Sequence, residues 1–285
     1  MLDLIIVSFL WSFSFVIIKG SLTELDSNLV SAIRLLLAMV VFLPFFRPRG
    51  MTVRLAARLL LLGAVQFGLM YACYTASFAY LPAYMLVLLT TTTPLLVVFF
   101  DMLFSKRNVP LFWCAALLAV IGAGLLKFQD DGLAFNWKGV LLLQASNAAF
   151  AIGQIAYRHL VRTVPDWNAR SSFALIYAGG ATVCLLASLV TVDFASLTIT
   201  PQQGGMLLYL GVVASGLCFF LWNRGATRVG PATLGLMNNL KIPLGVIVAI
   251  AVLHESFNPY VLLLSLALFF LALWISRKAE RTLRG

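Results

Sequence analysis

One lysine in the middle of a long apolar run is the residue best placed to do chemistry. Lys241 lies near the centre of residues 231–252, where a cation costs about 2.5–3.5 kcal/mol on insertion scales. Each end of the run is about 15 Å away at 1.5 Å per residue, too far for a lysine to reach. We therefore expect Lys241 to face the interior of a helix bundle and to bind an anionic group of a substrate, such as a carboxylate or phosphate. The alternative is a structural lysine that bonds carbonyl groups freed by Pro243 or pairs with an acid.

Polar residues close to this lysine and in another apolar run could complete a binding site. Asn238 precedes Lys241 by three residues, so the two share one helix face. We expect Asn238 to bind substrate or to brace Lys241, with a hydrogen bond between helices as the structural alternative. Gln144 and Asn147 also share a helix face. We expect them to line the cavity or to bond neighbouring helices.

A second cation and several aromatic residues are further candidates. Arg34 lies about 10 Å inside its run, a depth from which arginine can reach the membrane surface. It is therefore either an interfacial residue or a gate and second anion contact. Trp11, Tyr71 and Tyr74 could shape a cavity for an amphipathic metabolite, with packing against lipid as the alternative for each.

The sequence lacks the usual patterns of enzymes and metal sites. It contains no HExxH, no GxSxG and no phosphate-binding GxxxxGK[ST] motif. The four cysteines lie in apolar runs without a CxxC pair. We therefore expect a protein that is not an enzyme and that has no catalytic residues, no metal and no cofactor.

The elements that must carry these residues are membrane helices. Of the 285 residues, 62% are apolar and 11% are charged, against roughly 25% charged in soluble domains. So few charges exclude a soluble enzyme, and the net charge of +10 then indicates basic cytoplasmic loops rather than a nucleic-acid partner. Ten apolar runs could each span a bilayer. They cover residues 2–19, 27–46, 55–79, 82–104, 110–127, 138–157, 169–192, 204–226, 231–252 and 258–276.

The basic residues indicate how these spans are oriented. If the N-terminus is cytoplasmic, the inner loops and the C-terminal tail hold 15 lysines and arginines and the outer loops hold three. We therefore expect a multi-pass protein of the cytoplasmic (inner) membrane with both termini in the cytoplasm. The first run has no basic stretch before it and no cleavage site after it, so we expect it to be retained as a helix.

Prolines indicate an internal duplication. Three pairs share an offset of 149 residues: Pro82 and Pro231, Pro94 and Pro243, and Pro110 and Pro259. We expect the middle pair to kink their helices. Two repeats, residues 1–128 and 129–285, would then hold five helices each. An odd number makes the second copy inverted, which is the architecture of secondary transporters.

The same offset pairs Lys241 with Thr92. We expect Thr92 to contribute to the substrate site from the first repeat. The alternative is a hydroxyl that bonds a carbonyl of its own helix, as threonines in membrane helices often do.

Three short motifs carry a resemblance to a known family. They are the tryptophan-containing residues 10–15, the arginine motif of residues 34–38 and the glutamate motif of residues 253–255. Together with the duplication, they resemble the EamA module of the drug/metabolite transporter superfamily. Lys106 departs from the pattern, because the first copy commonly has a glutamate there. The resemblance implies ten helices in two inverted repeats and, for most members, export of amino acids and related metabolites.

We therefore expect a secondary transporter that exports a small anionic or zwitterionic metabolite, with an amino acid as the expected substrate, by alternating access. The alternatives are an organic-anion or sugar-phosphate exchanger and, from another class, a structural or receptor-like membrane protein. The expected partners are the substrate, the lipid bilayer and a proton or counter-substrate, with no nucleic acid.

Overall fold

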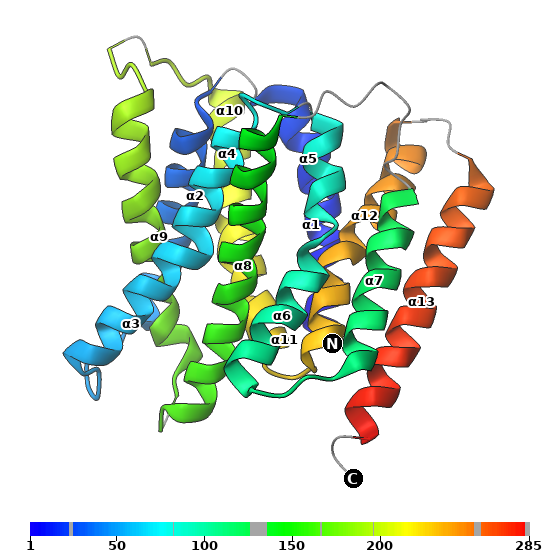
Figure 1. The fold of residues 1–285 in the computed structure, drawn as a ribbon. Coiled ribbons are helices and arrows are strands. Elements are labelled where there is room, and N and C mark those ends of the chain that lie inside the picture. Colours follow the sequence, from blue (N-terminus) through cyan, green and yellow to red (C-terminus); the bar gives the residue numbers. More distant parts are fainter. Residues whose placement is uncertain are drawn as a thin grey trace.

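The computed structural model describes residues 1–22, 25–81, 83–125, 136–165, 167–195, 197–253 and 258–282. Every regular element in these residues is helical, which confirms the predicted all-α class. The longer helices stand side by side as one bundle (Figure 1).

The helices belong to a first and a second part of the chain. The first part contains α1 (Leu2–Ser21), α2 (Ser27–Phe42), the 3-10 turn η1 (Leu43–Phe45), α3 (Val53–Gly63), η2 (Ala64–Leu69), α4 (Met70–Ser77), α5 (Ala83–Thr90), α6 (Thr93–Ser105) and α7 (Pro110–Leu125). The second part contains α8 (Trp137–Thr163), α9 (Ala169–Thr191), α10 (Pro201–Tyr209), η3 (Leu210–Leu217), α11 (Cys218–Ala226), α12 (Pro231–Leu253) and α13 (Pro259–Thr282).

Many of these helices can cross a bilayer. Seven helical runs in the described residues are long and apolar enough to do so. They are Ser27–Phe45, Val53–Ser77, Met85–Ser105, Trp137–Thr163, Ala169–Thr191, Pro201–Ala226 and Pro259–Thr282. Two shorter apolar stretches, Leu2–Ser12 and Pro110–Leu125, accompany them. The chain is therefore a multi-pass integral membrane protein.

Two of the runs contain a π-helical stretch that the sequence did not predict. η2 joins α3 to α4, and η3 joins α10 to α11. The π-helix is rare and is frequently found at functional sites. Gln66 of η2 reaches across to the second of these runs, where its Nε2 donates a hydrogen bond of 3.0 Å to Oδ1 of Asn223. Both side chains are fully buried, so this bond joins the two runs inside the bundle.

The helix that carries Pro94 is interrupted, which corrects the prediction of a kink within one helix. α5 ends at Thr90 and α6 begins at Thr93. Pro94 is thus the second residue of α6, where a backbone N–H has no partner within the helix in any case. Threonine hydroxyls in this segment bond helix carbonyls, Thr90 that of Leu86 and Thr91 that of Leu88. Pro243, in contrast, lies inside the continuous α12.

Glycines allow α3 and α9 to cross with their backbones in contact. A Cβ atom on Gly63 would lie 1.7 Å from the carbonyl oxygen of Ile176, and one on Gly179 would lie 2.0 Å from that of Leu60. Close backbone approach at small residues is the usual means of packing helices in membranes. This crossing therefore requires glycine at both positions.

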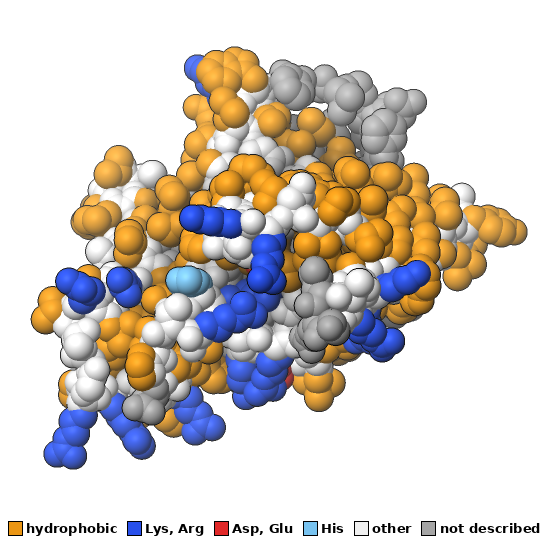
Figure 2. Space-filling model, turned by 60° about the horizontal axis from the view of Figure 1, so that its bottom comes forward, with side chains coloured by type: hydrophobic (Ala, Val, Ile, Leu, Met, Phe, Trp, Pro, Cys, Tyr) orange, Lys and Arg blue, Asp and Glu red, His pale blue; other side chains and the backbone are white. Residues whose placement is uncertain are grey.

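The surface is divided into a basic end and apolar sides (Figure 2). The basic end is the end of the bundle where α6, α11 and α13 finish, at the bottom of Figure 1. Exposed basic residues there are Lys106, Arg107, Arg228, Arg277 and Arg281. Along the sides, large apolar residues of α13 such as Leu263 and Phe270 are 63% and 62% exposed, as expected of a surface covered by lipid.

Candidate functional site

Lys241 stands over an aromatic ring, and the described residues give it no charged partner. Its Nζ lies 5.5 Å from the centroid of the Trp11 ring, a distance at which a cation is attracted to the ring face. In the part of the chain that the structure describes, no carboxylate lies within 4.0 Å of this ammonium group, and it donates no hydrogen bond. The Lys241 side chain is half-buried.

Trp11, on α1, is held in place by contacts with η3 and α11 in the second part of the chain. Its indole Nε1 donates a hydrogen bond of 2.8 Å to the carbonyl of Ala214 in η3. The ring lies 5.0 Å from that of Trp222 and meets the ring of Phe219 edge-on at 5.4 Å, both on α11. The ring under Lys241 is therefore fixed by the π-helical run.

Arg34 is the second cation at the site. It is only 8% exposed, and its Nε donates a hydrogen bond of 3.0 Å to Oγ of Ser215. Its guanidinium carbon lies 5.3 Å from the centroid of the Tyr71 ring. Arg34 is thus packed against Ser215 and Tyr71 within the bundle, and its role as a gate or second anion contact stays a prediction.

The two cations stand at opposite ends of a row of rings. Tyr71 meets Phe219 edge-on at 6.4 Å, and Phe219 in turn meets Trp11. We call Trp11, Phe219 and Tyr71 the aromatic row. Lys241 stacks on its first ring and Arg34 on its last. Phe219, which completes the row, was missed at the sequence level because nothing distinguishes it from the many other phenylalanines.

Asn238 braces helices rather than Lys241, which corrects that part of the prediction. Its Nδ2 lies 3.3 Å from Oε1 of Gln154 and donates a bond of 3.0 Å to the carbonyl of Leu234. The same Gln154 oxygen accepts a bond of 3.1 Å from Nε1 of Trp222. Asn238 is thus used to join α12 to α8 and α11, while Lys241 turns to Trp11 on α1.

Thr92, Gln144 and Asn147 come together at the break between α5 and α6. Oγ1 of Thr92 lies 2.9 Å from Oε1 of Gln144 and 2.8 Å from the carbonyl of Leu89. Nδ2 of Asn147 donates a bond of 3.1 Å to the same carbonyl. A helix break leaves such carbonyls without their usual partners. These three residues therefore satisfy the backbone at this break, which is the structural alternative that the sequence allowed.

Tyr74 lies one turn beyond Tyr71 on α4. It is half-buried, and its ring meets that of Phe78 edge-on at 5.1 Å. Tyr74 also packs against the cluster of Met85, Leu86 and Leu143.

A model of the EamA-like transporter family matches residues 1–128 and 137–277 of this chain. A protein of Escherichia coli strain K12 named biotin transporter is 38% identical over 279 residues, which cover 96% of this chain and 92% of that protein. A protein of Pseudomonas aeruginosa strain PAO1 named probable biotin transporter is 38% identical over 287 residues, which cover 99% of each. A crystal structure with 16% identity superposes with a TM-score of 0.79 over 98% of this chain and 97% of the other, which shows a shared fold.

Proposed function

Because the chain belongs to the EamA-like transporter family, as its motifs predicted, it is a transporter of a small metabolite, and we propose that it carries biotin or a closely similar carboxylate. The observation that carries the proposal is Lys241 over Trp11, with no carboxylate partner among the described residues. Lys241 provides the counter-charge for the carboxylate, and the aromatic row provides an apolar surface for the remainder of the molecule.

The chemistry of biotin suits this arrangement. Biotin joins one carboxylate, by a saturated chain, to two small fused rings whose polar groups are uncharged. A single cation at one end of an apolar surface matches that distribution. The names of the two 38% identical relatives support the same substrate.

An amino acid would need a different site. Its ammonium group requires an anion or several acceptors, whereas both charged groups on the aromatic row are cations. Neither these contacts nor the names of the relatives support the amino-acid substrate expected from the sequence.

We also propose ten spans in two inverted repeats, residues 1–128 and 129–285, in the inner membrane with both termini cytoplasmic. Helix pairing supports the repeats, because the first span of each repeat packs on the fourth span of the other. These pairs are α1 with α12 and α8 with α6. The π-helical stretches support them too, because η2 and η3 each lie in the third predicted span of a repeat. Inverted repeats of this kind rock about a central site, which is the basis for alternating access.

Arg34 favours a second candidate, the organic-anion or sugar-phosphate exchanger. A substrate with two negative charges could engage Arg34 and Lys241 at the two ends of the aromatic row. The exchanger differs from a biotin carrier in requiring a counter-substrate on the opposite side of the membrane.

The test is transport by the purified protein in proteoliposomes. We expect saturable movement of labelled biotin, competition by desthiobiotin, and no competition by biotin amide, which lacks the charge. Vesicles without protein provide the control. Competition by amino acids with no effect of desthiobiotin would overturn the proposal. Uptake of a sugar phosphate only into vesicles preloaded with phosphate would establish the exchanger instead, and vesicles loaded on either side also give the direction and any dependence on a proton gradient.

A further inference from the structure

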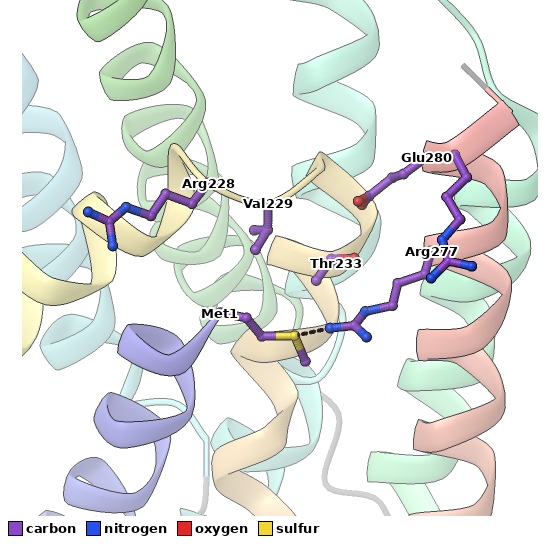
Figure 3. A pocket seen from close by; sticks show the side chains of 7 residues that line it. Met1, Arg228, Val229, Thr233, Arg277 and Glu280 are labelled. Atoms are coloured by element: carbon purple, nitrogen blue, oxygen red, sulfur yellow. Dashed lines mark hydrogen bonds between the residues drawn. The ribbon is translucent and has the colours of Figure 1, made fainter. Parts of the chain in front are cut away.

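We propose that a pocket at the basic end binds the phosphate group of an anionic membrane phospholipid. The pocket has a volume of about 250 Å³ and lies where α12 begins and α13 ends (Figure 3). Met1, Thr233, Arg277, Glu280 and Arg281 are among the residues that line it. It lies apart from the aromatic row and shares no residue with it.

Two arginines give the pocket an unbalanced positive charge. In the described residues, neither Arg277 nor Arg281 lies within 4.0 Å of a carboxylate. The side chain of Arg277 points to Met1 and contacts its sulfur, a weak acceptor that leaves the charge uncompensated (Figure 3). Arg228 also lines the pocket, but its charge is shared with Asp3, because its Nη1 lies 3.6 Å from Oδ2 of that residue.

Glu280, the acidic residue of the pocket, contacts the start of α12. The carboxylate of Glu280 lies against Gly230, where an added Cβ atom would be 2.0 Å from Oε1. Gly230 directly precedes α12, and a negative charge is favoured at a helix N-terminus. Oγ of Ser276 lies 3.4 Å from the same oxygen, and this hydroxyl is also 2.9 Å from that of Thr233. The Glu280 carboxylate therefore contacts α12, and the guanidinium groups of Arg277 and Arg281 can bind an added anion.

The position of the pocket along α13 indicates that this anion belongs to a lipid. Trp274 is 60% exposed, and Lys278 stacks on it at 5.3 Å. An exposed tryptophan with a basic residue beyond it is typical of the boundary between acyl chains and headgroups. Arg277 and Arg281 follow within two turns, at headgroup level. The apolar face of α13 before Trp274, with Leu271 45% exposed, offers a surface for the acyl chains. Basic pockets between helices at this level bind anionic headgroups.

The experiment compares lipids on the purified full-length protein in detergent. Phosphatidylglycerol, phosphatidylcholine and inorganic phosphate are titrated separately, and binding is read from the thermal unfolding midpoint and from lipid retained in native mass spectrometry. We expect phosphatidylglycerol to raise the midpoint and to be retained, phosphatidylcholine to do neither, and inorganic phosphate to have little effect at equal concentration. Stabilisation by inorganic phosphate equal to that by phosphatidylglycerol would overturn the lipid assignment.

Variants locate the binding. Arg277→Gln with Arg281→Gln should weaken phosphatidylglycerol binding by about tenfold or more, because two charge-assisted contacts are lost. The matched control is Lys106→Gln with Arg107→Gln, which removes the same charge from the basic end outside the pocket and should bind as wild type does. If the double variant does not fold, the exposed Arg281→Gln alone provides the comparison. Equal retention by the pocket variant and the wild type would overturn the proposal.

Discussion

Asp3 and Arg224 form a two-point ion pair that joins the start of α1 to the end of α11. Nε of Arg224 lies 2.9 Å from Oδ2 of Asp3, and Nη2 lies 2.9 Å from Oδ1. The side chain of Asp3 is 10% exposed and that of Arg224 is 39% exposed. Gly225 next to the pair packs against Leu4, with a hypothetical Cβ 2.9 Å from its side chain. The ion pair and this packing contact thus join α1 to α11 at the basic end.

Breaking this pair should destabilise the protein. Asp3→Asn removes the carboxylate that Arg224 contacts at two points. Arg224→Gln leaves the Asp3 carboxylate with Arg228, at 3.6 Å, as its remaining cation. We expect a loss of about 1–2 kcal/mol for each, less than for a fully buried pair because Arg224 is partly hydrated. A double-mutant cycle on unfolding in detergent measures the coupling. A coupling energy near zero would show that the pair contributes nothing to stability.

Lys241→Gln should abolish most transport while the protein still folds. Contacts to a charged group contribute about 1.5–3 kcal/mol, so loss of the ammonium should reduce uptake of biotin by about tenfold or more. Lys241→Arg should retain part of it. The matched control is Lys138→Gln, because Lys138 also stacks on a tryptophan, Trp137 at 6.0 Å, but at an exposed position. Normal uptake by Lys241→Gln would exclude Lys241 as the substrate cation.

Much of this site could be predicted from the sequence, because membrane burial makes charge conspicuous. An apolar run around Lys241 or Arg34 is visible without any structure. The residues that contact them cannot be identified from the sequence alone. Arg34 and Ser215 are 181 residues apart, and only the fold brings them together. The same is true of Trp11 and Ala214, which are 203 residues apart.

The fold shows a similar division. Hydropathy locates the helices, because each span must bury its own backbone hydrogen bonds. It cannot locate η2 or η3, because a π-helical stretch has the same composition as the α-helix around it. The break before Pro94 was also missed, since a proline near the middle of an apolar run can either kink a helix or start a new one.

Trp222→Phe should reduce stability more than it reduces transport. The substitution keeps most of the ring contact with Trp11 but removes the N–H that bonds Gln154 at 3.1 Å. The buried Gln154 oxygen then keeps only the weaker contact with Asn238 at 3.3 Å. We expect a loss of about 1–2 kcal/mol on unfolding. If the apparent affinity for substrate changed while stability did not, the indole would belong to the binding surface instead.

Alanine should have opposite effects at two glycines. Gly179→Ala places a Cβ against the backbone of Leu60, which cannot move without shifting α3, and should cost about 1–3 kcal/mol. Gly205→Ala in α10 meets nothing within 4 Å and should stabilise by up to about 1 kcal/mol through helix propensity. Thermal unfolding of both variants in the same detergent gives the comparison. Equal effects would mean that the crossing of α3 and α9 is looser than described.

Single cysteines should label from opposite sides of the membrane. Arg49 and Gln202 are both exposed. Arg49 lies shortly before α3 and Gln202 is the second residue of α10, and these two helices begin at opposite ends of the bundle (Figure 1). In a variant without the four native cysteines, Gln202→Cys should react with an impermeant maleimide on intact cells. Arg49→Cys should react only after permeabilisation, because the basic end is retained in the cytoplasm. The unsubstituted cysteine-free protein controls for background. Labelling of Arg49→Cys on intact cells would reverse the proposed orientation, and with it the side from which Lys241 meets its substrate.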